Sequence, residues 1–127
     1  MIDLAVVIAH TADLCRKPYQ HAVVPIHEEA EPSSIDDLFV RIETRDASGS
    51  RMEAMDLELE IYRSGSDVNL MLSWCDQAER PILWQGQHPV WMQGDNGMRC
   101  TAPADGQPLE AIARRLRAQL VGQSRVD

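Results

Sequence analysis

The stretch Met52–Trp74, which reads MEAMDLELEIYRSGSDVNLMLSW, decides the fold of this chain. In it, two arms in which every second residue is apolar flank the polar segment Arg63–Ser66. A period of two is typical of a strand with one buried face, and the glycine of the polar segment suits the positive φ of a tight hairpin. The pattern therefore predicts two antiparallel strands whose inward residues are Met55, Leu57, Leu59, Ile61, Val68, Leu70, Leu72 and Trp74.

Counting from the turns predicts the register of these strands. If Ser64-Gly65 is a two-residue loop, Leu59 lies opposite Leu70 and each inward residue of one arm meets an inward residue of the other. A similar loop at Ser48-Gly49 joins the first arm to an earlier alternating segment and sets Leu38 opposite Leu59. We therefore expect a meander of three strands over about residues 37–46, 51–63 and 66–75, with Leu59 between Leu38 and Leu70.

The segments that follow the meander predict more strands and a final helix. Apolar runs at 82–84 and 90–92 indicate short strands, and Asn96-Gly97 is a strong hairpin signal. A stripe of apolar residues with helical spacing then predicts a C-terminal helix that ends near Gly122; its members are Leu109, Ile112, Ala113, Leu116 and Leu120.

Residues 2–17 fit two structures. Leu4–Ala9 has the β-branched content of a buried strand, whereas the apolar pattern through Cys15, with Asp3 as N-cap, fits a helix. The pattern continues beyond the length of a strand, so we favour the helix. The expected fold is α+β: an antiparallel meander sheet of five to six strands, with the C-terminal helix packed on one face and an N-terminal helix beside it.

The length of 127 residues predicts a single domain over residues 1–127. Three prolines break residues 18–34 into an irregular connection, which has room for a short extended piece at 22–26. Residues 122–127 are expected to form a frayed tail.

Composition argues against several classes of partner and location. With 20 acidic and 12 basic residues the net charge is −8, which disfavours binding to nucleic acid and to anionic lipid. The three cysteines are odd in number and form no CxxC motif, which favours a reducing compartment. The longest apolar run, Leu4–Ala9, is too short to span a membrane and follows no basic segment. We expect a cytoplasmic protein.

No motif in the sequence predicts a cofactor, a metal or a catalytic residue. Glycine-rich phosphate loops, nucleophile elbows and dinucleotide fingerprints are absent, and the four histidines have no zinc spacing. Asp56, Glu58 and Glu60 follow one another on one strand face, where carboxylates can hold a hard cation or exchange protons. A solvated sheet face explains the same alternation without a further assumption, and we favour that explanation.

All three tryptophans, Trp74, Trp84 and Trp91, fall within eighteen residues. Such a cluster lines a ligand pocket or peptide groove in some proteins, and in more of them it fills the core. Trp74 closes the inward row of the meander, so we expect it to be buried. At least one of the other two should be partly exposed, because they flank a Gly-Pro-containing loop.

We expect a non-catalytic interaction protein, such as an adaptor, an assembly factor or a chaperone-like accessory protein. It would act through a sheet face or the tryptophan cluster, and a homodimer would let Arg41 of one subunit meet Glu58 of the other. The alternative is a small-molecule-binding protein or minor hydrolase with a tryptophan-lined pocket that uses His88, Cys100 or the acidic row. The candidate interaction residues are Phe39, Arg41, Glu58, Met71, Trp84 and Trp91.

Overall fold

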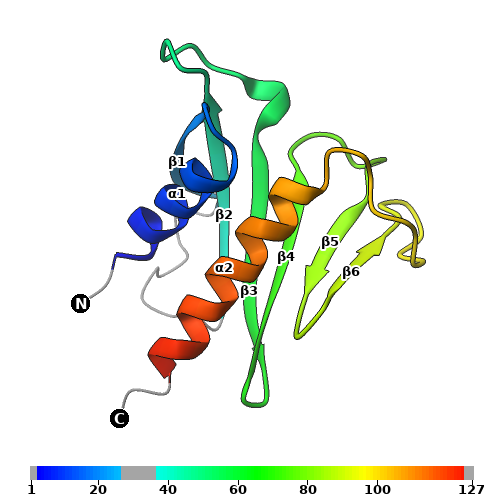
Figure 1. Cartoon of the computed structure of the whole chain (residues 1–127). Helices are drawn as coiled ribbons and strands as arrows, with labels where there is room; N and C mark the ends of the chain where they lie inside the picture. Colours follow the sequence, from blue (N-terminus) through cyan, green and yellow to red (C-terminus); the bar gives the residue numbers. More distant parts are fainter. Residues whose placement is uncertain (1–2, 27–36, 125–127) are drawn as a thin grey trace.

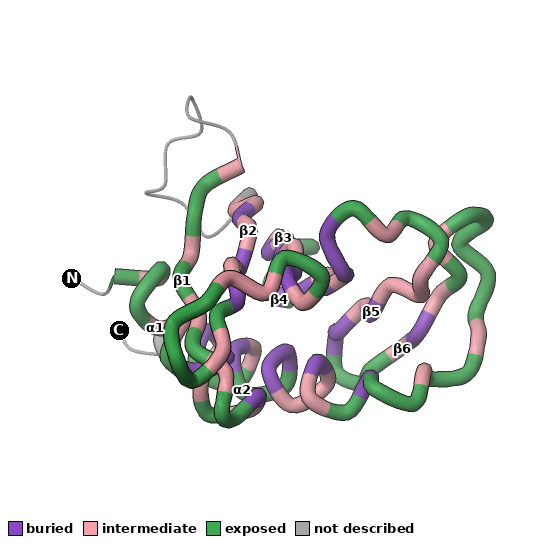
Figure 2. The backbone as a smooth tube through the Cα atoms, turned by 90° about the horizontal axis from the view of Figure 1, so that it is seen from above, coloured by how far each residue is buried: buried purple, intermediate pink, exposed green. Residues whose placement is uncertain are grey.

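A computed structural model of the chain describes residues 3–26 and 37–124 and has the expected α+β architecture. In the described part, six antiparallel strands form one sheet in the order β1-β2-β3-β4-β5-β6, and two helices lie on one side of it (Figures 1 and 2). The element bounds are α1 Leu4–Cys15, β1 Gln20–Pro25, β2 Asp37–Arg45, the 3-10 turn η1 Glu53–Met55, β3 Leu57–Ser64, β4 Asp67–Trp74, β5 Ile82–Gln85, β6 Pro89–Met92 and α2 Gln107–Ser124.

The N-terminal segment is a helix, as its apolar period favoured. The carboxylate of Asp3 accepts a hydrogen bond from the backbone N–H of Ala5 at 3.0 Å and caps the first turn. Ile8 and Ala12 are buried in the same core as the sheet and α2. Because α1 packs beside α2 on the inner face, it does not cover the opposite, outer face of the sheet.

The predicted faces of the strands are confirmed, but the predicted register is wrong by two residues in both hairpins. Leu59 lies opposite Val40 and Leu72, and not opposite Leu38 and Leu70. In the second hairpin the closing pair is Ser64 with Asp67, so the loop is Gly65-Ser66. Gly65 has a φ of +64°, which matches the type II′ turn that takes glycine at its first central position.

The first hairpin differs because its loop is longer than alternation alone predicts. Asp46 accepts hydrogen bonds from the N–H groups of Ser48 and Ser50, and this organises the turn around Gly49. The 3-10 turn η1 then interrupts the predicted strand over 51–63, so β3 begins at Leu57. Met55, expected on the inward row, lies in η1 instead.

The remaining strands confirm the predicted segments. β5 and β6 pair around the 86–88 loop, and the predicted turn at Asn96-Gly97 returns the chain so that Arg99 forms a bridge with Met92. The predicted extended piece at 22–26 corresponds to β1. Residues 27–34 of the predicted connection and 125–127 of the predicted tail lie outside the described residues.

The core lies between the inner face of the sheet and the two helices (Figure 2). The predicted stripe of α2 is buried in full: Leu109, Ile112, Ala113, Leu116 and Leu120. The helix ends at Ser124, two residues after Gly122, near which its end was expected.

Candidate interaction face

The outer face of the sheet, opposite the helices, carries a row of side chains that crosses five strands. Phe39, Glu60, Met71, Trp84 and Val90 lie opposite one another in register, from β2 to β6. Each of these residues is half-buried. Four of the five are apolar, which is unusual for a face that serves only to meet water. We call this set the apolar row.

Trp84 is held in a fixed position within the apolar row. Its indole Nε1 donates a hydrogen bond to the hydroxyl of Tyr62 at 2.8 Å, across the intervening strand β4. Its six-membered ring lies over Gly86, where an added Cβ would come within 2.6 Å of the indole. An aromatic side chain that is already immobilised loses little entropy on binding, which is the property of an interface anchor.

A charged row runs beside the apolar row, one step further along the strands. Arg41 on β2 lies opposite Glu58 on β3, and Glu58 lies opposite Ser73 on β4. The register predicted from the Ser48-Gly49 loop, with Leu38 opposite Leu59, would put Arg41 opposite Asp56, and it is wrong by two residues here as well. Among the described residues no ion pair joins Arg41 to Glu58, although their backbones are adjacent. Both side chains are half-buried, so this face presents a plus and a minus charge side by side.

Trp91 does not belong to the outer face. It is 5% exposed and stacks on Trp74, with ring centroids 6.2 Å apart and an interplanar angle of 22°. Its Nε1 donates to Glu110 of α2 at 2.6 Å. The predicted burial of Trp74 and partial exposure of at least one other tryptophan are confirmed, since Trp84 is the half-exposed member.

A pocket of about 270 Å³ lies at the end of the charged row. Glu58, Ser73 and Trp74 contribute to its wall, together with the 76–80 loop, in which Asp76 has a φ of +57°. The guanidinium of Arg80 stacks 3.5 Å from the ring centroid of Trp74 and is also bonded to Asp105. Neither Trp84 nor Trp91 lines this pocket.

The other groups named for a hydrolase are not brought together. Cys100 packs against the core, whereas His88 is exposed in the turn between β5 and β6, and no hydrogen bond joins the two in the described part of the chain. Burial, the largest cause, raises the pKa of the Cys75 thiol to about 11 and also raises that of Cys15. Both thiols are therefore protonated at neutral pH and are weak nucleophiles.

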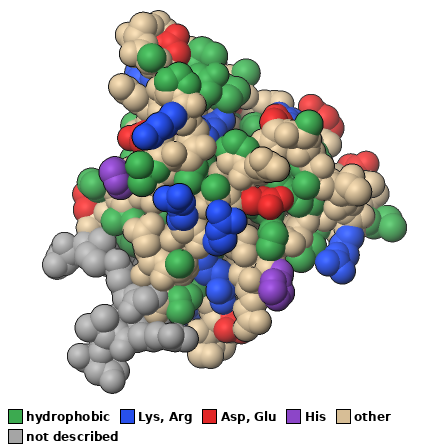
Figure 3. All heavy atoms as spheres, viewed as in Figure 1, with side chains coloured by type: hydrophobic (Ala, Val, Ile, Leu, Met, Phe, Trp, Pro, Cys, Tyr) green, Lys and Arg blue, Asp and Glu red, His purple; other side chains and the backbone are tan. Residues whose placement is uncertain are grey.

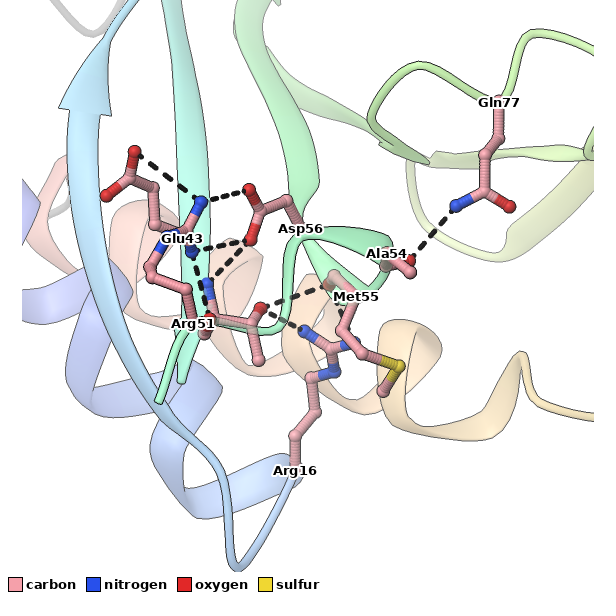
Figure 4. Close-up of polar contacts among 8 residues, drawn as sticks. Arg16, Glu43, Arg51, Ala54, Met55, Asp56 and Gln77 are labelled. Atoms are coloured by element: carbon pink, nitrogen blue, oxygen red, sulfur yellow. Dashed lines mark hydrogen bonds and ion pairs between the residues drawn. The ribbon is translucent and has the colours of Figure 1, made fainter. Parts of the chain in front are cut away.

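The predicted acidic row of Asp56, Glu58 and Glu60 is interrupted at its first member. Asp56 is 3% exposed, and its two carboxylate oxygens accept hydrogen bonds from Arg51 at 3.0 and 2.7 Å (Figure 4). The backbone N–H of Thr44 donates to the same carboxylate. Burial opposes ionisation, but these hydrogen bonds and the charges of Arg51 and Arg41 together hold the pKa of Asp56 below its usual value. Asp56 is thus a structural ion.

Sequence reasoning missed a second part of this polar cluster. Arg16, buried at the end of α1, donates to the hydroxyl of Thr44 and to the carbonyl of Met55 (Figure 4). Another N–H of Arg16 lies 3.2 Å from Nε2 of His21, whose Nδ1 contacts Asp13 at 2.9 Å. The contacts tie α1 to β1, β2 and η1. The one feature of the sequence that could have indicated this cluster is Arg16, directly after the predicted helix, and an arginine at a helix end is too common to predict a buried cluster.

Groups of three or more potential metal ligands are absent from the residues that the structure describes. None of the helices found there is long and apolar enough to cross a membrane. The helix-covered face, seen in Figure 3, carries basic side chains at its centre, and Arg114 and Arg115 of α2 are exposed there. The outer face carries charges of both signs, with Arg41 opposite Glu58.

Comparison with known proteins places the chain in a family. A family model described as "Domain of unknown function (DUF8659)" matches residues 5–119. This protein belongs to that family. The match runs from α1 almost to the end of α2, so the sheet and both helices lie within the family's domain. Neither the curated proteins nor the solved structures include a match.

Proposed function

We propose that this member of the family is a non-catalytic interaction protein, an adaptor, assembly factor or chaperone-like accessory protein, that binds another protein chain through the outer face of its sheet. The observation that supports this is the apolar row, in which Phe39, Met71 and an immobilised Trp84 stand half-exposed on the face opposite both helices. Central aromatic anchors with flanking charges are the common composition of protein–protein interfaces.

The edges of the sheet support a role for its face, because both are partly blocked. The backbone N–H of Ile26 donates to the carbonyl of Phe39 on β2. Because successive N–H groups along a strand point to opposite sides, the even-numbered residues of β1 bond to β2 and the odd-numbered ones point away from it, to the free edge of the sheet. There the N–H of His21 is already bonded to Asp13, and Pro25 has none. At the other edge, Trp91 of β6 accepts a hydrogen bond from Cys100. Strand addition is therefore disfavoured at either edge.

The occupant that we propose is a second copy of the chain. Most soluble oligomers are closed homo-oligomers, and a two-fold interface requires a surface that is complementary to itself. The outer face meets this requirement because Arg41 and Glu58 lie side by side on it. Attraction between opposite charges across the interface would offset the repulsion between two chains of −8 each.

Single charged substitutions in the apolar row test this function. We expect the wild type to run as a dimer at micromolar concentration in sedimentation velocity and light scattering, and Phe39→Lys and Met71→Glu to run as monomers. Val6→Lys, on the exposed side of α1 at 62% exposure, is the matched control and should remain dimeric. Circular dichroism checks that each variant is folded. A monomeric wild type refutes self-association, and a dimer that survives both substitutions places the interface elsewhere.

The pocket beside Trp74 supports one other candidate, a small-molecule-binding protein or minor hydrolase. A ligand that binds only the folded state raises the melting temperature by mass action. A thermal-shift panel of metal ions and small molecules therefore tests this candidate, with Glu58→Gln as the variant that alters the pocket wall. The candidate is abandoned if no compound shifts the wild type.

We further propose that the protein acts in the cytoplasm, without nucleic acid or membrane as its partner. The net charge of −8 repels phosphate backbones and anionic headgroups. An odd number of cysteines without a CxxC motif suits a reducing compartment. Fractionation of cells that express the tagged chain would test the location directly.

A further inference from the structure

We propose that the junction between α1 and the sheet is a pH-sensitive switch, in which a proton on Nε2 of His21 displaces Arg16 and detaches the C-terminal end of α1 from the sheet. The junction is a cluster of four side chains and one backbone carbonyl, which we call the His21 cluster: Asp13, Arg16, His21, Thr44 and the carbonyl of Met55. The inference goes beyond the proposed function and is independent of it, because α1 packs on the inner face of the sheet (Figure 2).

The hydrogen bonds of His21 fix its protonation state in the closed cluster. A guanidinium only donates hydrogen bonds and keeps its charge inside proteins. Nε2 of His21, which lies 3.2 Å from a guanidinium nitrogen of Arg16, is therefore an acceptor. The single ring proton is then on Nδ1, which donates to the carboxylate of Asp13 at 2.9 Å. The closed cluster thus contains the neutral Nδ1–H tautomer of His21.

The closed cluster has no acceptor for a second ring proton. The side chain of His21 is 0% exposed and Arg16 is 6% exposed, so the contact between them is shielded from water. A proton on Nε2 would put two N–H donors and two positive charges 3.2 Å apart, where they repel each other and neither donor has an acceptor. Protonation of His21 is therefore incompatible with the position of Arg16.

Of the two cations, Arg16 is the one that leaves. Nδ1 of His21 is bonded to Asp13, and a positive ring strengthens that hydrogen bond. The backbone N–H of His21 also donates to Asp13 at 2.7 Å, and His21 pairs with Thr44 in the sheet. Arg16 is the C-cap residue of α1, and a single guanidinium makes its bonds to Thr44 and Met55 (Figure 4). Departure of Arg16 breaks these bonds together and detaches the end of the helix.

The charged groups that face His21 come from α1 and η1, and burial decides the balance between them. Asp13 of α1 and Asp56 at the end of η1 favour the protonated ring, whereas Arg16 disfavours it. On β2 the residue opposite His21 is the uncharged Thr44. Burial is the largest influence, and together with Arg16 it lowers the pKa of His21 below 6.5. Acid therefore favours the open form, in which the ring lies in water.

Contacts outside the His21 cluster keep the opening local. Ile8 and Ala12 of α1 are buried in the core, and Gln119 of α2 donates to the hydroxyl of Thr11 at 3.2 Å. None of these contacts involves a group that titrates near neutral pH. The first turns of α1 therefore stay packed on α2, and the opening is confined to residues 13–19.

Proton linkage gives the size of the effect. If the open form titrates near pH 6.5 and the closed form does not titrate above about pH 5.5, the ratio of open to closed molecules rises about tenfold between about pH 7.5 and pH 5.5. Titration of the closed form within this range makes the rise smaller. We therefore expect a rise of about three- to tenfold.

Hydrogen exchange measured by mass spectrometry at about pH 7.5 and pH 5.5 tests the switch. Each rate is divided by the intrinsic rate of the unfolded peptide at that pH, so the quotient reports opening alone. For residues 13–19 the quotient should rise about three- to tenfold at the lower pH. It should also exceed the quotient of β3 at both pH values, because β3 opens only on global unfolding. Absence of the rise overturns the switch, and quotients equal to those of β3 overturn its local character.

The variant His21→Gln identifies the titrating group. Its side chain keeps an oxygen that accepts from Arg16 but takes up no proton in this range, so the quotient for residues 13–19 should not change with pH. His88→Gln is the matched control, since His88 is exposed in the turn between β5 and β6, and it should behave as the wild type. A rise in His21→Gln as large as in the wild type, or its loss in His88→Gln, assigns the effect to another group and overturns the proposal.

Long-range proton–nitrogen NMR spectra test the His21 cluster without relying on stability. At about pH 7.5, Nδ1 of His21 should carry the proton and Nε2 should carry none; the opposite tautomer overturns the arrangement with Arg16. The signals are assigned by their loss in His21→Gln. Arg16→Met removes the opposing charge and should raise the pKa of His21, whereas Arg16→Lys keeps the charge and should leave the pKa low. Equal pKa values for His21 in the wild type and in Arg16→Met overturn the role assigned to Arg16.

Discussion

Truncation of Leu59 tests the assignment of the inner face on which the outer-face proposals depend. Leu59 is 0% exposed and lies between Val40 and Leu72 at the centre of the sheet. Leu59→Ala removes three carbon atoms, which at about 0.8 kcal/mol each is roughly 2.4 kcal/mol of lost transfer free energy. The surrounding strands are fixed on both sides by their ladders, so the site collapses little and a cavity cost is added. We expect a total loss of about 3–5 kcal/mol.

The matched control is Leu14→Ala, the same substitution on the outside of α1. Leu14 is 44% exposed, so its truncation removes little buried area and costs less than about 1 kcal/mol. Urea unfolding followed by circular dichroism gives both values from the change in midpoint at constant slope. A loss below about 0.5 kcal/mol for Leu59→Ala would mean that the inner and outer faces are assigned in reverse. Equal losses for the two variants would also contradict the reasoning.

Three further predictions concern tryptophan exposure and pH. Iodide should quench Trp84 more strongly than Trp74 or Trp91, read from variants that keep one tryptophan each; equal quenching contradicts the assigned burial. The pKa of Asp56 is lowered in the folded state, so its stabilising contribution is present above about pH 4 and is lost as the pH falls through the folded value. The urea midpoint of the wild type should therefore fall between about pH 5 and pH 3, and Asp56→Asn should show a smaller fall. An equal fall in the two proteins would refute this. Burial, with Arg16 nearby, lowers the pKa of His21, so stability should fall as the pH drops below about 6.5, and His21→Gln should remove that slope.

The faces of the strands could be predicted from sequence, whereas their register could not. Alternation assigns each residue to a face with a period of two, and a shift of two residues leaves that assignment unchanged. Leu59 was therefore placed correctly in the core with the wrong neighbours. The error arose in the loops, where the side chain of Asp46 and the 3-10 turn at Glu53–Met55 take up residues that alternation counts as strand.

The tryptophans show where alternation gives no information. Ile82-Leu83-Trp84 is apolar at every position, so the segment does not indicate which side chain points inward. In the structure Leu83 pairs with Leu72 and with Trp91, and this places Leu83 and Trp91 in the core and Trp84 on the outer face. Only the pairing of β5 with the central strand β4 could decide whether Leu83 or Trp84 points into the core. Of the candidate interaction residues, Trp91 lies in the core and the other five lie on the outer face: Phe39, Arg41, Glu58, Met71 and Trp84.

The same register shift changes what the outer face can do. With Arg41 opposite Asp56, as counted from the sequence, the arginine would lie beside a carboxylate that already accepts two hydrogen bonds from Arg51. In the structure Arg41 lies opposite Glu58, which has no ion pair in the described part of the chain. A plus and a minus charge then remain for a second chain to engage. The side chain of Asp46 and the 3-10 turn η1 lie outside this face, but they set how many residues separate β2 from β3. They therefore determine that Arg41 lies opposite Glu58, which gives the face its self-complementary pattern.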